Sequence, residues 1–371
     1  MDEIKINVTR SSMPPLEEYV EEITPLWESR WLSNHGVIAQ KLEEEIKARL
    51  DVVDVCTFVN GHMALEVAIQ SLFLPRGAEV ITTPYTHIST THAITRNGLT
   101  PVFVDIEPVH YTLDPDRIEE AVTEKTAAIV ATHVYGFPCD VKRIEAIAKK
   151  YGLVVIYDAA HAFNVKYKEI GIGNFGDYSM FSCHATKVFH TIEGGLITCK
   201  PEHASEMRRI RQIANFGNVS EDDISYVGPN AKMNEFAAAM GICNLRHLDE
   251  MIALRRAADT RYCERLMDVP GIHVPRPSAE TEWNCIYFPV VFDGVHFNRD
   301  TVKAKLDAHG IYARKYFYPL TNMANCYASQ YGAADLPVAR EVSQNVLTLP
   351  MFSDLTPEMV DEICDVILKE D

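Results

Sequence analysis

Short apolar segments alternate with helical patterns along the first 200 residues of the chain. Six of these segments have the length of a β-strand, at residues 78–83, 100–106, 126–134, 152–158, 178–182 and 194–199. Helical periodicity lies between several of them, as in residues 140–152, where Val141 and Ile144 begin an apolar face. Strands that are apolar on both faces and alternate with helices predict an α/β fold with a mainly parallel central sheet. Only a loop separates the last two strands, so we expect that end of the sheet to be irregular or antiparallel.

A second pattern follows in the C-terminal third. Residues 230–266 form one long stretch of helical character without proline. After residues 269–277 we expect a strand, a helix, a strand and a helix, at residues 285–292, 299–310, 346–352 and 357–370. We therefore predict a large domain over residues 1–250, including an N-terminal segment, and a smaller C-terminal α+β domain over residues 251–371.

The charge of the chain narrows the classes of function. The 371 residues carry a formal net charge of -17. Such a chain repels a phosphate backbone, which argues against nucleic acid as a partner. A small basic cluster, Arg208, Arg209 and Arg211, lies in a helical stretch, and we expect it to form a solvated or anion-facing surface.

The spacing of the cysteines and the lengths of the apolar runs indicate the cellular compartment of the protein. The nine cysteines are scattered singly without a C-x-x-C pair, so we expect reduced thiols, no disulfide framework and no metal site. The acidic N-terminus has no apolar signal segment, and no apolar run has the length of a membrane span. We expect a cytoplasmic protein without a membrane partner.

One glycine motif is misleading. The sequence GIGNFG at residues 171–176 matches the dinucleotide fingerprint G-x-G-x-x-G. That fingerprint acts between a strand and a following helix, whereas here a strand pattern follows the motif. We interpret it as a glycine-rich loop, and the alternative of a nicotinamide-dependent dehydrogenase rests on this motif alone.

Asp158 ends an apolar strand, which places its carboxylate at the C-terminal edge of the sheet, where ligands bind in open α/β folds. The alternative is that Asp158 is the N-cap of a following helix. His161 follows three residues later and could equally be a core histidine with satisfied hydrogen bonds. These two residues alone do not decide between the interpretations.

Lys187 favours a catalytic interpretation. It follows the strand at 178–182, which ends at Ser182, and glycines at 194 and 195 follow it. A lysine is rarely buried unless it is paired or functional. A lysine of lowered pKa near a carboxylate is what Schiff-base chemistry on pyridoxal phosphate (PLP) requires, and Asp158 would be the acid partner of the ring nitrogen.

The cofactor would also need a phosphate site. Asn60 and Gly61 form a turn signal directly before a helical pattern, and the free N–H groups of a helix N-terminus can hold a dianion. The alternative is an ordinary junction between loop and helix.

Taken in order, these motifs resemble the DegT/DnrJ/EryC1/StrS family of PLP-dependent sugar aminotransferases. The resemblance rests on RWLSNHGVIAQKLEEEI, TTPYTHISTTHAI, DAAHAF, FGDYSMFSCHATK with EGG, and GPNAKMNEFAAA, and it weakens in the C-terminal domain. It implies the aspartate-aminotransferase fold (PLP fold type I). D-A-A-H-A, S-x-H-x-T-K and E-G-G at this spacing are specific.

The resemblance also implies roles for single residues. Lys187 would bind the cofactor covalently and move the proton. Asp158 would pair with the pyridinium nitrogen, and His161 would lie near the ring and its 3′-oxygen. The phosphate would be held by Gly61, His62 and Ser182. Asn230 would reach the phosphate in the partner subunit, which implies a homodimer with shared active sites.

Three positions depart from the family pattern. His62 stands where the family usually has threonine, so it would donate through its ring or only through its backbone N–H. His87 stands where an aromatic residue usually stacks on the cofactor ring. Thr321 stands where many members have histidine, which leaves the sugar contacts there open.

The implied reaction is transfer of the amino group of L-glutamate to a nucleotide-linked 4-keto-6-deoxy sugar. Within the family, the motifs are most similar to those of enzymes that make dTDP-4-amino-4,6-dideoxyglucose. Amination at the neighbouring ring carbon, and a relative that binds PLP or sugar without turnover, remain alternatives; a dehydratase is disfavoured because Lys187 is present. The nucleotide is open, as is the end product, for which the O-antigen of lipopolysaccharide, S-layer glycans and secondary metabolites are candidates.

Overall fold

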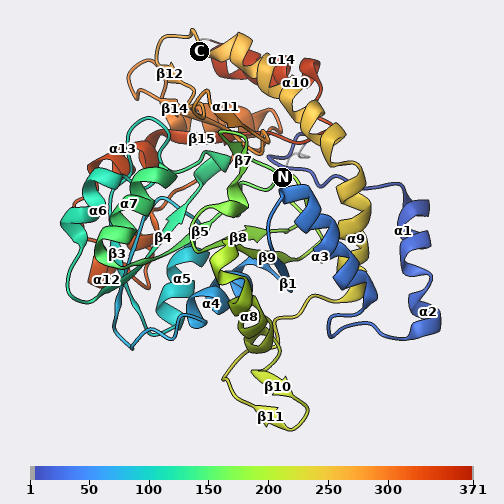
Figure 1. The fold of residues 1–371 in the computed structure, drawn as a ribbon. Coiled ribbons are helices and arrows are strands. Elements are labelled where there is room, and N and C mark those ends of the chain that lie inside the picture. Colours follow the sequence, from blue (N-terminus) through green and yellow to red (C-terminus); the bar gives the residue numbers. More distant parts are fainter. Residues whose placement is uncertain (1–4, 370–371) are drawn as a thin grey trace.

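The computed structural model describes residues 5–369, and its centre is a seven-stranded sheet (Figure 1). The strand order is β1-β9-β8-β5-β4-β2-β3. The bounds are β1 Val55–Phe58, β2 Glu79–Thr82, β3 Thr100–Phe103, β4 Thr126–Thr132, β5 Val154–Asp158, β8 Tyr178–Ser182 and β9 Gly195–Cys199. Strand β9 runs opposite to the other six strands of this sheet, which are parallel to one another. The predicted α/β class and the antiparallel end are confirmed, whereas β1 was not among the strands expected from the sequence.

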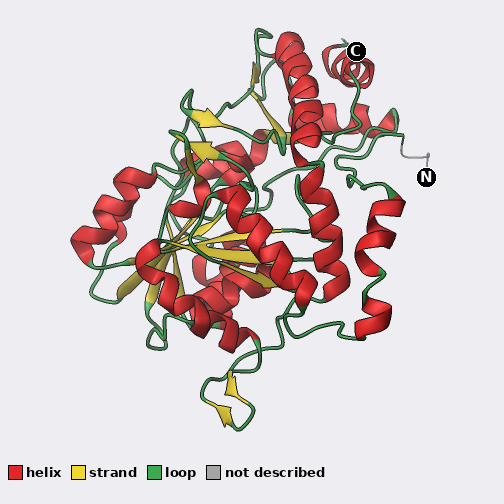
Figure 2. Ribbon diagram, turned by 45° about the vertical axis from the view of Figure 1, so that its right-hand side comes forward, coloured by secondary structure: helices red, strands yellow, loops and turns green. Residues whose placement is uncertain are grey.

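Helices cover both faces of this sheet (Figure 2). Alternate residues of a strand face opposite layers. In β4, Ala128 and Val130 pack in one cluster with α4 (Gly61–Gln70), α5 (Ile88–Arg96) and α8 (Met207–Ala214). The intervening Ile129 and Ala131 pack with α6 (Pro115–Ala121) and α7 (Val141–Tyr151). This alternation explains why the strands are apolar on both faces.

The loop with the GIGNFG motif does not join a strand to a helix. Gly171 ends the two-residue strand β7 (Ile170–Gly171), which pairs with β6 (Lys166–Tyr167) and, through it, with β13 (Thr281–Glu282). A short 3-10 turn, Ile172–Asn174, and then β8 follow. The motif therefore lacks the helix N-terminus that a dinucleotide site needs.

The C-terminal third adds a three-stranded antiparallel sheet, β12-β14-β15. The elements are α10 Leu248–Leu266, β12 Ile272–His273, β14 Phe288–Phe292, α11 Arg299–Ala308, α12 Ala328–Tyr331, α13 Pro337–Asn345, β15 Val346–Leu349 and α14 Pro357–Leu368. The expected helix 230–266 is two helices, α9 (Glu235–Arg246) and α10, which meet at His247. The predicted domain boundary at 250/251 falls inside α10 and stays a prediction; residue 370 of the last expected helix lies outside the described residues.

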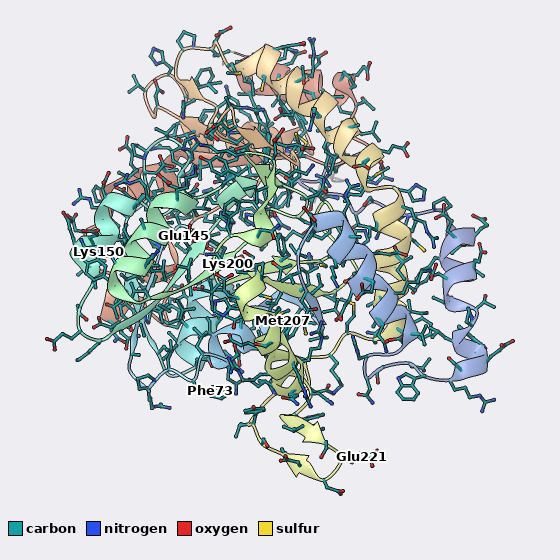
Figure 3. All side chains as sticks on the ribbon, viewed as in Figure 1. Phe73, Glu145, Lys150, Lys200, Met207 and Glu221 are labelled. Carbon is teal, nitrogen blue, oxygen red and sulfur yellow. The ribbon has the colours of Figure 1, made fainter. Side chains whose placement is uncertain are left out.

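The N-terminal segment joins distant parts of the chain. Ile6 belongs to the apolar cluster of the C-terminal sheet and forms a bridge with Ile311. Helices α1 (Leu16–Ile23), α2 (Leu26–Ser29) and α3 (Val37–Leu50) follow, and α1 and α3 pack on α9. A hairpin of β10 (Asn218–Ser220) and β11 (Asp223–Ile224) projects from the body, with Glu221 at its tip (Figure 3). No helix within residues 5–369 is both long and apolar enough to span a membrane.

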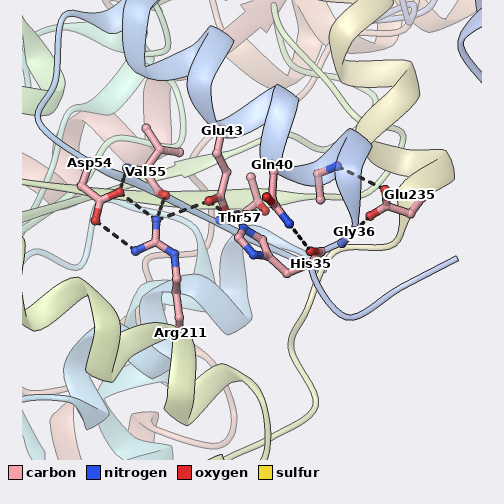
Figure 4. A network of polar contacts seen from close by, with 10 residues as sticks. His35, Gly36, Gln40, Glu43, Asp54, Val55, Thr57, Arg211 and Glu235 are labelled. Atoms are coloured by element: carbon pink, nitrogen blue, oxygen red, sulfur yellow. Dashed lines mark hydrogen bonds and ion pairs between the residues drawn. The ribbon is translucent and has the colours of Figure 1, made fainter. Parts of the chain in front are cut away.

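A buried polar network ties α3 to the sheet and to α8 (Figure 4). The Glu43 carboxylate accepts hydrogen bonds from the Thr57 N–H at 2.8 Å and the Thr57 hydroxyl at 2.9 Å. Arg211 donates to Asp54 at 2.7 Å, to Glu43 at 3.3 Å and to the Val55 carbonyl. Arg211 of the basic cluster thus faces carboxylates of the chain itself.

Glu235 caps the N-terminus of α3 from 199 positions away in the sequence. This buried carboxylate accepts the N–H of Gly36 at 3.0 Å and that of Ile38 at 2.8 Å. The first N–H groups of a helix have no acceptor inside the helix, and a negative charge there is favourable. Glu235 therefore fixes where the N-terminal segment enters the fold.

We expect Glu235→Ala to lower the free energy of unfolding by about 1–3 kcal/mol, because it leaves buried N–H donors without an acceptor. Urea unfolding followed by circular dichroism measures this change. The matched control is Glu250→Ala, which truncates an exposed glutamate of α10. Equal midpoints for the two variants would contradict the capping role.

Candidate active site

A cavity of about 520 Å³ opens at the carboxyl ends of the parallel strands. Strands β4, β5 and β8 end at its wall with Thr132, Asp158 and Ser182. The C-terminal part of the chain adds Tyr287, Arg314, Tyr316 and Phe317 to the lining. All but one of the residues predicted for the site line this cavity, namely Gly61, His62, His87, Asp158, His161, Ser182 and Lys187.

Lys187 lies in the loop between β8 and β9, with its ammonium group inside the cavity. Its Nζ donates to the Tyr287 hydroxyl at 3.3 Å and lies 5.6 Å from the centre of that ring. Burial lowers the pKa of Lys187 to about 8, although the nearby Asp158 carboxylate favours the charged form. Half of the amine is therefore neutral near pH 8, as a nucleophile or a base requires.

Asp158 is the last residue of β5 and is 3% exposed. One carboxylate oxygen accepts from the Thr90 hydroxyl at 2.6 Å, and the other accepts from the Ala160 N–H at 3.1 Å. No helix begins after Asp158, so the N-cap interpretation is wrong. The carboxylate is instead a rigid negative charge at the floor of the cavity.

His161 is a buried histidine that also lines the cavity. Its Nδ1 accepts the N–H of Tyr135 at 3.1 Å, and its ring lies parallel to Phe317 with centroids 5.9 Å apart. Burial, and then the charge of Lys187, hold its pKa well below the usual range. His161 is therefore neutral and flat against the cavity wall.

The N-terminus of α4 faces the same cavity. Asn60 caps the helix by accepting the Met63 N–H at 2.8 Å, while the N–H groups of Gly61 and His62 have no acceptor within the helix. A Cβ on Gly61 would lie 3.0 Å from the Ser182 Cβ, and a Cβ on Gly195 would lie 2.6 Å from the Gly61 Cα. The glycines thus let the donors of α4 come close to the end of β8.

The two histidines that depart from the family pattern occupy the wall beside this helix. His62 bonds through Nδ1 to the Ser89 hydroxyl at 2.8 Å. His87 is the N-cap of α5, because its Nδ1 accepts the Ser89 N–H at 3.2 Å. Desolvation, and then the charge of Lys187, lower the pKa of His87.

Asn230 is the one predicted residue that lies outside the cavity. It is exposed, and its amide oxygen accepts from Lys232 at 2.6 Å. Lys232 also donates to Asn215 at 2.6 Å, next to the projecting hairpin. The predicted contact of Asn230 with the cofactor of a partner subunit stays a prediction.

Sequence reasoning missed the residues that the C-terminal part and α5 bring to the site. Tyr287 lies in an apolar run and Thr90 in a polar helix, and neither carried a signal. Arg314 could have been noticed as a cation in an aromatic loop, YARKYFYP. Its guanidinium donates to the Tyr316 hydroxyl at 2.5 Å, and no described carboxylate forms an ion pair with it.

Comparison with known proteins agrees with this geometry. The sequence profile of the DegT/DnrJ/EryC1/StrS aminotransferase family matches residues 16–368. The chain belongs to this family. It is 41% identical over 363 residues to a dTDP-4-amino-4,6-dideoxy-D-glucose transaminase of Shigella dysenteriae, covering 98% of both chains. It is 39% identical to an enzyme of the same name from Escherichia coli, covering 99% of both.

A solved structure supports the same assignment. The structure superposes on DesI, crystallised in the presence of its TDP-sugar product, with a TM-score of 0.93 and 32% identity. The match covers 98% of this chain and 92% of that one. This protein is therefore an aminotransferase whose cofactor is PLP, and the aspartate-aminotransferase type of fold is confirmed.

The residues present fit PLP chemically. The cofactor carries an aldehyde, a basic ring nitrogen and a phosphate dianion. The cavity offers an amine of lowered pKa on Lys187 for the aldehyde and a buried carboxylate on Asp158 for the ring nitrogen. The N-terminus of helix α4 at Gly61 suits the phosphate, and the absence of a Cβ on Gly61 lets this helix end lie close to Ser182. No group of three or more histidine, cysteine, aspartate or glutamate side chains within residues 5–369 could hold a metal ion.

We expect Lys187 to react with acetic anhydride at a rate that rises with pH and has its midpoint near pH 8 in the cofactor-free chain. Only the neutral amine reacts, and burial favours that form over the ordinary lysine midpoint of about 10.4. Mass spectrometry of the labelled peptide gives the profile, with the exposed Lys142 as internal reference. A midpoint of Lys187 above pH 10 would refute the lowered pKa.

Proposed function

We propose that the enzyme transfers the amino group of L-glutamate to C4 of dTDP-4-keto-6-deoxyglucose and so makes dTDP-4-amino-4,6-dideoxyglucose. The observation that carries the proposal is the identity of 41% and 39% to two transaminases of this name over nearly the full length. The cavity adds the chemistry, since it combines Lys187 with Asp158 at one strand edge. Such a sugar would serve surface glycans such as the O-antigen of lipopolysaccharide.

Bound PLP supplies an electron sink for the bonds that break at the amino carbon. Lys187 would hold the cofactor covalently until the donor amine takes its place. The freed Lys187 amine would then take a proton from the donor carbon in the first half of the reaction and deliver one to C4 of the sugar in the second. Asp158, held by Thr90, keeps a negative charge against the ring nitrogen without moving during the reaction. His161 limits the ring on one side, and His87 lines the same cavity.

Binding of the anionic groups is divided between the N-terminus of α4 and Arg314, which both line the cavity. Gly61, His62 and Ser182 hold the phosphate of the cofactor at the N-terminus of α4. Arg314, which lacks a carboxylate partner among the described residues, receives the carboxylate of glutamate. We also propose a cytoplasmic location, which the nine unpaired cysteines favour.

We expect the PLP-loaded protein to show a visible cofactor band that disappears in Lys187→Ala and that glutamate converts to the amino form of the cofactor. Added dTDP-4-keto-6-deoxyglucose should reverse the conversion and yield a sugar whose amine NMR places at C4. Asp158→Asn should retain the band yet slow the conversion by at least about a hundredfold, since the ring loses its fixed anion. An amine at C3 would favour the neighbouring-carbon alternative, and a band indifferent to every amino donor would favour the non-catalytic one.

We further propose that the active unit is a homodimer in which Asn230 reaches the cofactor phosphate of the partner subunit. Its exposure outside its own cavity supports this assignment. Because a mixed dimer of Lys187→Ala and Asn230→Ala subunits would contain one site with both residues intact, co-expression should restore activity that neither variant has alone. Absence of restoration in an isolated mixed dimer would refute a shared site.

A further inference from the structure

His62 is bonded through both ring nitrogens at the edge of the cavity. Its Nδ1 lies 2.8 Å from the Ser89 Oγ on α5, and its Nε2 lies 3.4 Å from a Glu66 carboxylate oxygen one turn along α4. Arg96 donates to the same carboxylate at 2.6 Å. The ring therefore joins α4 to α5 and cannot turn toward the cavity without losing both contacts.

The protons of this contact can be assigned by elimination. Bonds to His62 and to Arg96 lower the pKa of Glu66, so an ionised carboxylate faces Nε2 and holds a proton there. At Nδ1 the partner is a hydroxyl, which can donate or accept. When Nδ1 also carries a proton it donates to Ser89 Oγ, and the single hydroxyl proton of Ser89 is then free for another acceptor.

Ser89 and His62 both line the cavity beside Gly61 and Ser182. With Nδ1 donating to Ser89 Oγ, the Ser89 hydroxyl keeps its contact with His62 and still has a proton for a dianion at the N-terminus of α4. The same state directs the Ser89 hydroxyl proton toward the dianion. His87 at the N-cap of α5 and His92 on α5 are the other imidazoles near His62, and desolvation lowers the pKa of both, so neither adds a competing charge.

We propose that His62 and Ser89 form one phosphate-positioning pair, in which Ser89 donates to the PLP phosphate and His62 donates only through its backbone N–H. This assignment rests on the phosphate site proposed above. It answers the question that the sequence left open at position 62. The ring of His62 acts through Ser89 rather than on the cofactor, so His62 is a positioning residue and Ser89 the residue in contact.

The test compares the dissociation constants of PLP and of pyridoxal, which lacks the phosphate, for the full-length chain without cofactor. We expect Ser89→Ala and His62→Gln each to weaken PLP binding by about tenfold while leaving pyridoxal unchanged, as for loss of one hydrogen bond to a charged group. The double variant should bind PLP no more weakly than either single one, because both remove the same donor. Cofactor absorbance follows binding independently of turnover.

A second background separates a phosphate contact from a structural effect. His62→Thr places a hydroxyl directly on α4, so Ser89→Ala should have little effect in that background. The matched control is His92→Gln, which removes an imidazole of α5 that bonds to Tyr327 and does not line the cavity. Equal losses of affinity for PLP and for pyridoxal, or additive losses of PLP affinity in the double variant, would refute the proposed pairing of His62 with Ser89.

The phosphate site itself is tested in parallel. Ser182→Ala should also weaken PLP selectively, since Ser182 lies against Gly61 in the proposed site. If Ser182→Ala loses phosphate selectivity while Ser89→Ala and His62→Gln do not, the site stands and the pair is wrong. If none of the three variants changes the ratio of the two constants, the phosphate site proposed above fails with it.

Discussion

The site depends on the close approach of helix α4 to the ends of strands β8 and β9. A Cβ on Gly195 would lie 2.6 Å from the carbonyl carbon of Asn60, and a Cβ on Gly61 would lie 3.1 Å from the Ser182 Cα. Two glycines from distant parts of the sequence thus meet across one contact. Any side chain at these glycines would push the free N–H groups of α4 away from the edge of the sheet, where β5 ends at Asp158 and β8 ends at Ser182.

The C-terminal part of the chain contributes to the burial of the catalytic lysine. Tyr287 contacts the Lys187 amine and lines the cavity with Phe317, and burial favours the neutral amine. Tyr316 and then Asp158 oppose this effect, yet the Asp158 carboxylate is already bonded to Thr90 and Ala160. Burial is the larger influence, so the pKa falls to about 8 although a carboxylate is near.

Much of this arrangement could be predicted from the sequence, because apolar runs indicate where strands end and glycines indicate where backbone segments come close together. The apolar strands and the glycines indicated the edge where Asp158, Ser182 and Lys187 meet. The roles of Tyr287 and Glu235 could not be predicted, since each acts on a segment more than 90 positions away. The packing of Ile6 could not be predicted either, because its apolar side chain lies in a cluster of C-terminal residues and the sequence around Ile6 carries no pattern that indicates this contact.

Hydrogen-bond geometry also explains how an acidic chain can bind anionic ligands. His161 and His87 each accept a backbone N–H at Nδ1, so the neutral ring must carry its proton on Nε2. Desolvation lowers the pKa of both, and both therefore present donors without adding charge. When Lys187 is neutral, the cavity lining still offers two positive groups, the N-terminus of α4 and the guanidinium of Arg314. We therefore expect these two groups to be the anion sites of the cavity, although the chain as a whole carries a net charge of -17.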